Sequence, residues 1–418
     1  MLIADISSNR IRMIAATSGT FYGVAVTAGD LYTVAGAGTS GFAGDGGPAT
    51  AAELSGPEAV AVDGAGNLVI SDTGNQRIRL VAAASGTFYG QAMTAGDIYT
   101  VAGNGRFEFS GDGSPATAAG LRDPQGVTVD PSGNLVIADS FDNRVRVVAA
   151  TPGTFYGVAM TTGDIYTVAG NGTAAFAGDG GPATAAELFF PNATIVDGAG
   201  NLVIADFYNN RARVVAATSG SFYGQAMTAG HIYTVAGTGA AGYSGDGGPA
   251  TAATLRTPTS VTADAAGNLL IADSANNRIR AVAATPGSFY GQAMTAGDIY
   301  TVAGNGTYGF AGDGGPAASA ELRDPMGVSF DGSGNLLISD TNNERVRLVA
   351  AASGSYLGQA VSAGDIVTVA GNGTTGFLGD SGPAVHARLD FPRATAVDGT
   401  GSLLIVDGDN GRIRKVGA

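Results

Sequence analysis

The sequence contains no cysteine and no tryptophan, only two histidines, and a single lysine, Lys415. Without cysteine the chain has neither disulfides nor thiolate chemistry, a composition that suits the outside of a cell. His231 and His386 stand alone with no partner at a suggestive spacing, so they cannot build a histidine-rich metal site. No nucleophile-elbow motif is present either. We therefore predict no catalytic and no metal-binding residues.

The chain also lacks basic runs and long apolar runs. Its formal net charge is −14, which makes it a poor candidate for binding nucleic acid or anionic membranes. No apolar run reaches the roughly 18 residues that a membrane-spanning helix needs. No signal peptide is visible, and the chain opens in the middle of a repeat unit, so we expect a truncated N-terminus. We favour an extracellular or cell-surface location and expect a monomer.

Glycine, by contrast, is abundant, with 68 residues, and the apolar fraction of 44% suits a folded chain. Between Gly327 and Gly371, turn residues separate four short apolar runs. These are run a (Val328–Asp331), run b (Leu336–Asp340), run c (Arg345–Ala350) and run d (Ile366–Ala370). Runs of this length, rich in Val, Ile and Leu, predict β-strands, and four in succession predict one antiparallel sheet.

This unit recurs with a fixed period. The aspartate that ends run b returns every 67 residues, at Asp5, Asp72, Asp139, Asp206, Asp273, Asp340 and Asp407. A lone four-stranded sheet cannot bury both of its faces, so neighbouring units must stack. Repeated four-stranded sheets around a channel make a β-propeller. We therefore predict an all-β fold in which residues 1–418 form one propeller domain.

The repeated motif Pro-x-Gly-Val-x-x-Asp-x-x-Gly-Asn-Leu-x-Ile-x-Asp-x-x-Asn-x-Arg-Ile/Val resembles the NHL repeat. It is whole or nearly whole at Pro57–Ile78, Pro124–Val145 and Pro325–Val346. The connectors, which carry Val-Ala-Gly-Asn-Gly and Gly-Asp-Gly-Gly-Pro-Ala, are similar to a form found in bacterial NHL proteins. The resemblance implies a propeller but no single activity, because this fold hosts many functions.

The number of blades has two solutions, because the runs amount to two strands more than six blades of four need. We prefer six, the usual count in the NHL family. In that arrangement Leu31–Ala35 supplies strand d to the C-terminal runs a, b and c at Ala394–Val416, and this joint closes the ring and removes two open edges. The alternative is seven blades, of which the first lacks strand a and the last lacks strand d.

Strand order assigns the loops to two faces. In propellers the d-to-a and b-to-c connections lie on one face, here called the top face, and the a-to-b and c-to-d connections lie on the other. The d-to-a connector is long, as in Asn305–Pro325. Its segment Pro316–Leu322 predicts a short helix with proline in the first turn.

Three repeated motifs have structural interpretations. Asp-x-x-Gly-Asn, as in Asp63–Asn67, predicts a tight a-to-b turn rather than a calcium loop. Asp273 at the end of run b and Arg278 at the start of run c predict a structural ion pair or backbone brace that each unit repeats. Asp45 in the Gly-Asp-Gly-Gly-Pro loop predicts a cap for the following helical turn. A calcium ion at this aspartate is the alternative, and no other cofactor is expected.

No motif carries specific chemistry, so we favour a non-catalytic binding or scaffold module that presents its top face to a protein or glycan partner. The alternative is a metal-dependent hydrolase or lyase with its site in the central channel. The units differ most just before the proline of run a and in the b-to-c loop, and both places map to the top face. Exposed aromatic residues with a polar rim mark interaction sites. The predicted partner-binding residues are Phe141, Phe189, Phe190, Phe207, Tyr208, Arg122, Asp123, Arg256, Arg323 and Asp324.

Overall fold

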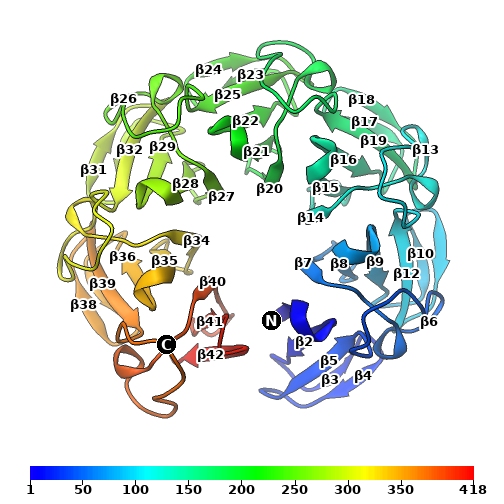
Figure 1. The fold of residues 1–418 in the computed structure, drawn as a ribbon, viewed down its shortest axis with the longest axis horizontal. Helices are drawn as coiled ribbons and strands as arrows, with labels where there is room; N and C mark the ends of the chain where they lie inside the picture. Colours follow the sequence, from blue (N-terminus) through cyan, green and yellow to red (C-terminus); the bar gives the residue numbers. More distant parts are fainter. The chain divides into compact units, whose positions relative to one another are not determined.

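The structure is a computed structural model that describes residues 1–418, and its chain forms a seven-bladed β-propeller with antiparallel sheets (Figure 1). A complete blade contains strands a, b, c and d in that spatial order. The a strands are β7 (Pro57–Val62), β14 (Pro124–Val129), β20 (Pro191–Val196), β27 (Pro258–Ala263), β34 (Pro325–Phe330) and β40 (Pro392–Val397). The b strands are β1 (Leu2–Asp5), β8 (Leu68–Asp72), β15 (Leu135–Asp139), β21 (Leu202–Asp206), β28 (Leu269–Asp273), β35 (Leu336–Asp340) and β41 (Leu403–Asp407).

The two remaining strand classes complete each blade. The c strands are β2 (Arg10–Ile14), β9 (Arg77–Val81), β16 (Arg144–Val148), β22 (Arg211–Val215), β29 (Arg278–Val282), β36 (Arg345–Val349) and β42 (Arg412–Val416). The d strands are β5 (Leu31–Ala35), β12 (Asp97–Ala102), β19 (Asp164–Ala169), β25 (Ile232–Ala236), β32 (Asp298–Ala303) and β39 (Asp365–Ala370). These bounds agree closely with the predicted runs.

Short elements fill the connections. The b-to-c loops contain single 3₁₀ turns: η1 (Ile6–Ser8), η3 (Thr73–Asn75), η5 (Ser140–Asp142), η7 (Phe207–Asn209), η9 (Ser274–Asn276) and η11 (Thr341–Asn343). The d-to-a connectors contain η2 (Ala49–Ala51), η4 (Ala116–Ala118), η6 (Ala183–Ala185), η8 (Ala250–Ala252), η10 (Ala317–Ser319) and η12 (Ala384–His386). Four connectors also carry two-residue strands: β6 (Gly47–Pro48), β13 (Ser114–Pro115), β26 (Gly248–Pro249) and β33 (Gly315–Pro316). None of these helical turns is long and apolar enough to cross a membrane.

A two-stranded hairpin occupies each c-to-d connection. The hairpins are β3–β4 (Gly19–Phe21, Val24–Val26), β10–β11 (Gly86–Phe88, Gln91–Met93), β17–β18 (Gly153–Phe155, Val158–Met160), β23–β24 (Gly220–Phe222, Gln225–Met227), β30–β31 (Gly287–Phe289, Gln292–Met294) and β37–β38 (Gly354–Tyr356, Gln359–Val361). In the second blade the Tyr89 hydroxyl donates to the carbonyl of Gly133 in the next blade, 3.0 Å away. The hairpin therefore braces neighbouring blades.

Strand b is buried throughout because its two faces pack against different blades. In β8, Leu68 and Ile70 join a cluster with Ile11 of the first blade, whereas Val69 joins a cluster with Leu135 of the third blade. Side chains alternate across a strand, so both faces of the sheet are covered. All five residues are fully buried. Stacking of blades, as the period predicted, supplies the core.

The preferred count of six blades is wrong, and the alternative of seven holds. β5 pairs with β2, in one three-stranded sheet with β1. β40, β41 and β42 form their own three-stranded sheet. The N-terminal b and c strands are thus not a spare hairpin, and β5 does not supply the missing d strand of the last blade. The repeat pattern left this choice open because the b-c-d and a-b-c sets both pack as partial sheets.

The chain divides into two compact units, and the boundary falls within the fourth blade. The first unit is Met1–Ile204 with Val215–Ser219 and Thr228–Tyr233, and the second is Ala205–Val214, Gly220–Met227 and Thr234–Ala418. Within the first unit, β7 and β14 lie next to each other (Figure 1). Within the second, β34 contacts both β27 and β40 in the same way.

The d-to-a connector joins consecutive blades through backbone hydrogen bonds. Gly36 N–H donates to the carbonyl of Ala49, which ties the connector to the end of strand d in the first blade. Ala49 N–H donates in turn to the carbonyl of Gly96, ahead of strand d in the second blade. The predicted proline-led turn is present as a 3₁₀ turn, with Pro48 at its N-cap.

Candidate functional site

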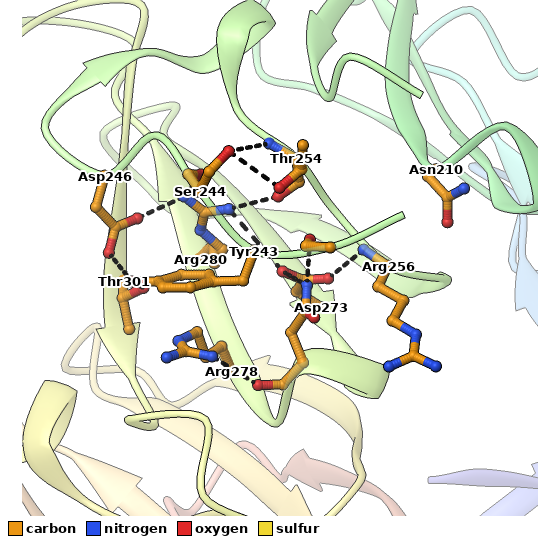
Figure 2. A network of polar contacts seen from close by, with 12 residues as sticks. Asn210, Tyr243, Ser244, Asp246, Thr254, Arg256, Asp273, Arg278, Arg280 and Thr301 are labelled. Atoms are coloured by element: carbon orange, nitrogen blue, oxygen red, sulfur yellow. Dashed lines mark hydrogen bonds and ion pairs between the residues drawn. The ribbon is translucent and has the colours of Figure 1, made fainter. Parts of the chain in front are cut away.

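Each complete blade contains a fully buried arginine, the second arginine of strand c. In the fifth blade this residue is Arg280, which lies between Asp246 and Asp273 (Figure 2). Its guanidinium also donates to the backbone carbonyls of Thr254, at 3.0 Å, and Ser244, at 2.9 Å. Equivalent arginines are Arg79, Arg146, Arg213 and Arg347. This network ties strands b and c to the connector and is structural.

The predicted ion pair of Asp273 with Arg278 is wrong, whereas the alternative of a backbone brace holds for Arg278. The two residues are direct cross-strand neighbours, but the ion pair of Asp273 is with Arg280, two residues further along the strand. Arg278 instead lies 3.4 Å from the ring centroid of Tyr243 and donates to the carbonyl of Asn276. Burial raises the pKa of Asp273 to about 6, although hydrogen bonds from Asn276 and the backbone of Arg256 and the charge of Arg280 oppose the rise.

The predicted capping role of the aspartate in the Gly-Asp-Gly-Gly-Pro loop is also wrong. The following turn has Pro48 at its N-cap and no side-chain cap. Asp45 instead pairs with the buried Arg79 at 2.7 Å, and its second oxygen accepts a hydrogen bond from Thr100. The equivalent aspartates of later blades also pair with the second arginine of strand c. They are Asp112, Asp246, Asp313 and Asp380. The group that contacts these carboxylates is therefore an arginine.

The Asp-x-x-Gly-Asn motif forms the predicted turn. One carboxylate oxygen of Asp63 accepts hydrogen bonds from the backbone N–H groups of Ala65 and Asn67, and the other accepts one from the Asn67 amide. The Asn67 side-chain oxygen accepts from Ala83 N–H just after strand c. The carboxylate of Asp63 also accepts a hydrogen bond from the Tyr89 hydroxyl of the hairpin at 3.2 Å, so protein donors engage both of its oxygens.

A half-exposed aromatic ring of each connector is also structural. It covers the first arginine of strand c with cation–π geometry, as Phe42 covers Arg77 at 3.6 Å. Phe109, Tyr243, Phe310 and Phe377 repeat this contact. The exposure of these rings therefore needs no external partner to explain it.

A second set of aromatic residues occurs in the third blade and does not follow the repeat. We call Phe107, Arg122, Phe141 and Phe190 the third-blade cluster. The Arg122 guanidinium lies 4.7 Å from the centroid of Phe107 and 5.8 Å from that of Phe141. Phe141 packs edge-on against Phe190 at 5.3 Å between centroids, with an interplanar angle of 84°. Phe107 is 54% exposed and Phe141 46% exposed, so the cluster is an apolar surface with a cation in it.

Phe190 reaches the third blade through a bond that links consecutive blades. Its φ of 57° lies in the left-handed region, and its backbone N–H donates to the Asn143 side chain at 2.9 Å. Asp123 and Asp324 occupy the same position in other blades, and their backbone N–H groups donate to the side-chain oxygens of Gln76 and Asn277. The residue before each run-a proline is therefore anchored to the b-to-c loop of the preceding blade. This contact puts Phe190 beside Phe141, as the sequence predicted.

The other predicted residues lie elsewhere. Phe189 is 37% exposed and, like Phe190, is not among the buried core residues. Phe207 and Tyr208 pack edge-on against each other at 4.9 Å in the second unit. Arg256 donates its backbone N–H to Asp273, and its side chain extends away from Arg280 (Figure 2). Arg323 and Asp324 contact Asn342 in the sixth blade.

Phe107 was missed because it lies in the connector, far from the two variable places in the sequence. A signal for it exists. Phe107 precedes Arg122 by 15 residues, and Tyr308 precedes Arg323 by the same interval. Arg323 stacks on Tyr308 at 4.6 Å, so the same pair occurs in the sixth blade. Comparison of arginine and aromatic positions between units would have found it.

The b-to-c loop of the third blade holds two neighbouring carboxyl groups, Asp139 and Asp142. Asp139 has no exposed surface and Asp142 is 7% exposed. Burial, followed by the charge of Asp142, raises the pKa of Asp139 to about 7. Burial also raises the pKa of Asp142, against the charge of Arg122. The sequence analysis did not single out this pair.

The two histidines lie apart from this region. His231 contacts the carbonyl oxygen of Gly180 through Nδ1 at 2.9 Å, and His386 ends the turn η12. No three histidine or acidic side chains are grouped in a way that could hold a metal ion.

Comparison with known proteins gives one family match and several distant structural matches. The family description "NHL repeat" matches residues 121–148, which confirms the resemblance for this part of the chain. No curated protein matches the sequence. A Bacteroides thetaiotaomicron protein of unknown function is 14% identical, with 97% of this chain and 80% of that chain covered and a TM-score of 0.48.

Two enzymes are among the other similar structures. A virginiamycin B lyase from Staphylococcus aureus is 12% identical over 87% of this chain and 84% of its own, with a TM-score of 0.44. A gluconolactonase from Xanthomonas campestris is 13% identical over 84% and 82%, with a TM-score of 0.41. Similarity this distant says nothing about activity.

Proposed function

We propose that the protein is a non-catalytic binding module whose third-blade cluster docks a protein partner. The observation that carries the proposal is the position of Phe141 and Phe190 outside the repeated framework. The repeated aromatics each cover the first arginine of strand c, whereas Phe141 is 46% exposed in a loop position where, of the other blades, only the fourth has an aromatic residue, Tyr208. The propeller framework does not require a phenyl ring at position 141, because other blades form the same b-to-c loop without one.

The ring geometry favours a protein over a glycan. A sugar stacks on a free, flat ring face, but Arg122 covers Phe107, and Phe190 meets Phe141 at 84°. Tilted rings with a guanidinium among them are the composition of protein–protein hot spots, in which aromatic residues and arginine are enriched. We therefore favour a protein segment over a glycan as the partner of the third-blade cluster.

The charge of the cluster narrows the chemistry of the partner. Arg122 makes no ion pair, whereas Arg393 in the seventh blade pairs with Asp409 at 3.4 Å. Stacking on Phe107 and Phe141 holds the Arg122 guanidinium in place without neutralising it. A partner segment that carries a carboxylate next to an apolar side chain would satisfy both the cation and the rings.

Selection from a displayed random-peptide library tests the proposal. Selected peptides should be enriched in acidic residues beside Leu, Phe or Trp, and Phe141→Ala should weaken their binding at least tenfold, which is about 1.4 kcal/mol. Tyr308→Ala is the matched control, because Tyr308 has the position of Phe107 and stacks on Arg323 in the sixth blade. Both variants should melt within about 2 °C of the wild type. Binding that survives Phe141→Ala, or a cluster that binds oligosaccharides only, would contradict a protein-docking role.

A further inference from the structure

The third blade differs from five others at the last residue of its b-to-c turn. Asn75, Asn209, Asn276, Asn343 and Asn410 occupy this position elsewhere, and the third blade has Asp142. Each asparagine donates an amide hydrogen to the aspartate three residues before it, as Asn276 does to Asp273 at 2.8 Å. An ionised carboxylate has no hydrogen to donate. The substitution therefore removes the donor on which the buried Asp139 would rely.

Asp142 stands where the asparagine amides of the other blades lie 2.8–3.0 Å from the equivalent aspartate, so its carboxyl group neighbours that of Asp139. The Oδ2 atoms of Asp139 and Asp142 are both buried, and neither has a hydrogen-bond donor. Two carboxylates this close in a dry environment resist ionising together, and they titrate as one coupled pair. A single proton between them restores the donor that asparagine supplies in the other blades.

Most of the charged groups around the pair already have other partners. The charged groups that face the pair are Arg122, Arg144 and Arg146, and Asp112 is the ion-pair partner of Arg146. Arg146 lies 3.6 Å from Asp139 but binds Asp112 more closely, at 2.7 Å. Arg144 donates to the carbonyls of Asp142 and Asn171. Arg122, which is stacked on Phe107 and Phe141, is therefore the remaining cation that can compensate a second negative charge on the Asp139–Asp142 pair.

This pair is directly connected to the third-blade cluster. Asp139 accepts the backbone N–H of Arg122 at 2.7 Å, and Phe141 N–H donates to the carbonyl of Arg122. Phe141 also lies between Asp139 and Asp142 in η5. When the last proton leaves, repulsion within η5 displaces Phe141, and attraction draws Arg122 away from the rings toward Asp142. Both effects break the contacts of Arg122 and Phe141 with the other rings of the third-blade cluster.

We propose that Asp139 and Asp142 share one proton that holds the third-blade cluster in its binding arrangement, so that the surface loses its partner when the pair loses that proton. This regulation rests on the proposed function of the cluster. If the arrangement requires the proton, the affinity for a selected peptide falls about tenfold between pH 6 and pH 8, because one proton with a midpoint near neutrality controls it.

Two measurements on Asp142→Asn and the wild type test the proposal. This variant restores the residue of the other blades and therefore preserves the fold. Its affinity for the peptide should be constant from pH 6 to pH 8. In protein labelled with 4-fluorophenylalanine, the fluorine signal of Phe141, assigned through Phe141→Leu, should titrate in the wild type and stay still in Asp142→Asn.

The two readouts separate the possible failures. A titrating Phe141 signal in a protein for which no peptide is selected would sink the proposed function and leave the proton-controlled arrangement intact. A selected peptide whose affinity does not change with pH, or a Phe141 signal that titrates equally in Asp142→Asn, would overturn the shared-proton proposal itself.

Discussion

Replacement of the buried arginine Arg280 by alanine should destabilise the protein far more than the same change at Arg278. Arg280 is fully buried and contacts Asp273, Asp246 and two backbone carbonyls (Figure 2). Arg278 lies at the end of its strand against the exposed ring of Tyr243. Removal of one partner from a buried ion pair typically costs about 3–5 kcal/mol of stability.

The structure divides this cost into two parts. The carbonyls of Thr254 and Ser244 lose charged donors, which costs about 1–2 kcal/mol for each carbonyl that stays unsatisfied. Asp273 loses its counter-ion, but burial already holds its pKa at about 6, so a further rise lets it take up a proton at pH 7. Because Asp273 can take up a proton, its additional contribution to the loss of stability is limited to about 1.4 kcal/mol at pH 7, the value of one pKa unit.

The same reasoning gives the pH dependence of the deficit. The pKa of Asp273 in the folded state is raised above its unfolded value, so the stability linked to its proton is fully present below the unfolded pKa and is lost as the pH rises through the folded pKa. Loss of Arg280 moves the folded pKa higher still. The deficit of Arg280→Ala relative to the wild type should therefore grow by about 1–2 kcal/mol between pH 5 and pH 8.

Urea unfolding followed by circular dichroism at pH 5, 7 and 8 measures these differences, with Arg278→Ala as the control at about 1 kcal/mol. The reasoning is refuted if Arg278→Ala costs as much as Arg280→Ala, or if the deficit of Arg280→Ala is the same at all three pH values. The first outcome would restore the cross-strand pairing that the sequence suggested.

Three further outcomes can be checked by simple measurements. Asn276→Asp rebuilds the carboxyl pair in the fifth blade and should make the thermal midpoint fall with rising pH between about pH 5 and 8, relative to the wild type; an unchanged pH profile would speak against proton sharing. Gly304→Ala should cost about 2 kcal/mol or more in urea unfolding, because Gly304 has a φ of 90° and a Cβ there would lie 2.2 Å from the carbonyl oxygen of Asn277. Calcium or zinc at millimolar concentration should leave the thermal midpoint unchanged, whereas a rise of several degrees would revive the alternative of a metal-dependent hydrolase or lyase.

The sequence alone determined the class of fold and the position of nearly every strand of the blades, but not the hairpin strands of the c-to-d connections. The 67-residue period, the apolar runs and the turn residues are local signals, and strands such as β8 and β28 begin and end within one or two residues of the runs. The Asp63–Asn67 turn was predictable for the same reason, because its hydrogen bonds join residues at most four positions apart.

Only the tertiary structure decided which side chains meet across loops and blades. Asp273 and Arg278 are opposite each other in register, yet the ion pair goes to Arg280, because its guanidinium alone is enclosed by the connector. Phe190 comes to Phe141 from the next connector through a contact that spans blades. Spacing along a chain does not specify such contacts, since they depend on how neighbouring blades stack.

The Asp139–Asp142 pair likewise depends partly on the sequence and partly on the tertiary structure. The replacement of asparagine by Asp142 is visible in the sequence, as one departure among many in a variable loop. Its consequence depends on burial, which only the packed structure supplies: an exposed pair of carboxylates would simply ionise, whereas burial of this pair opposes the loss of its last proton.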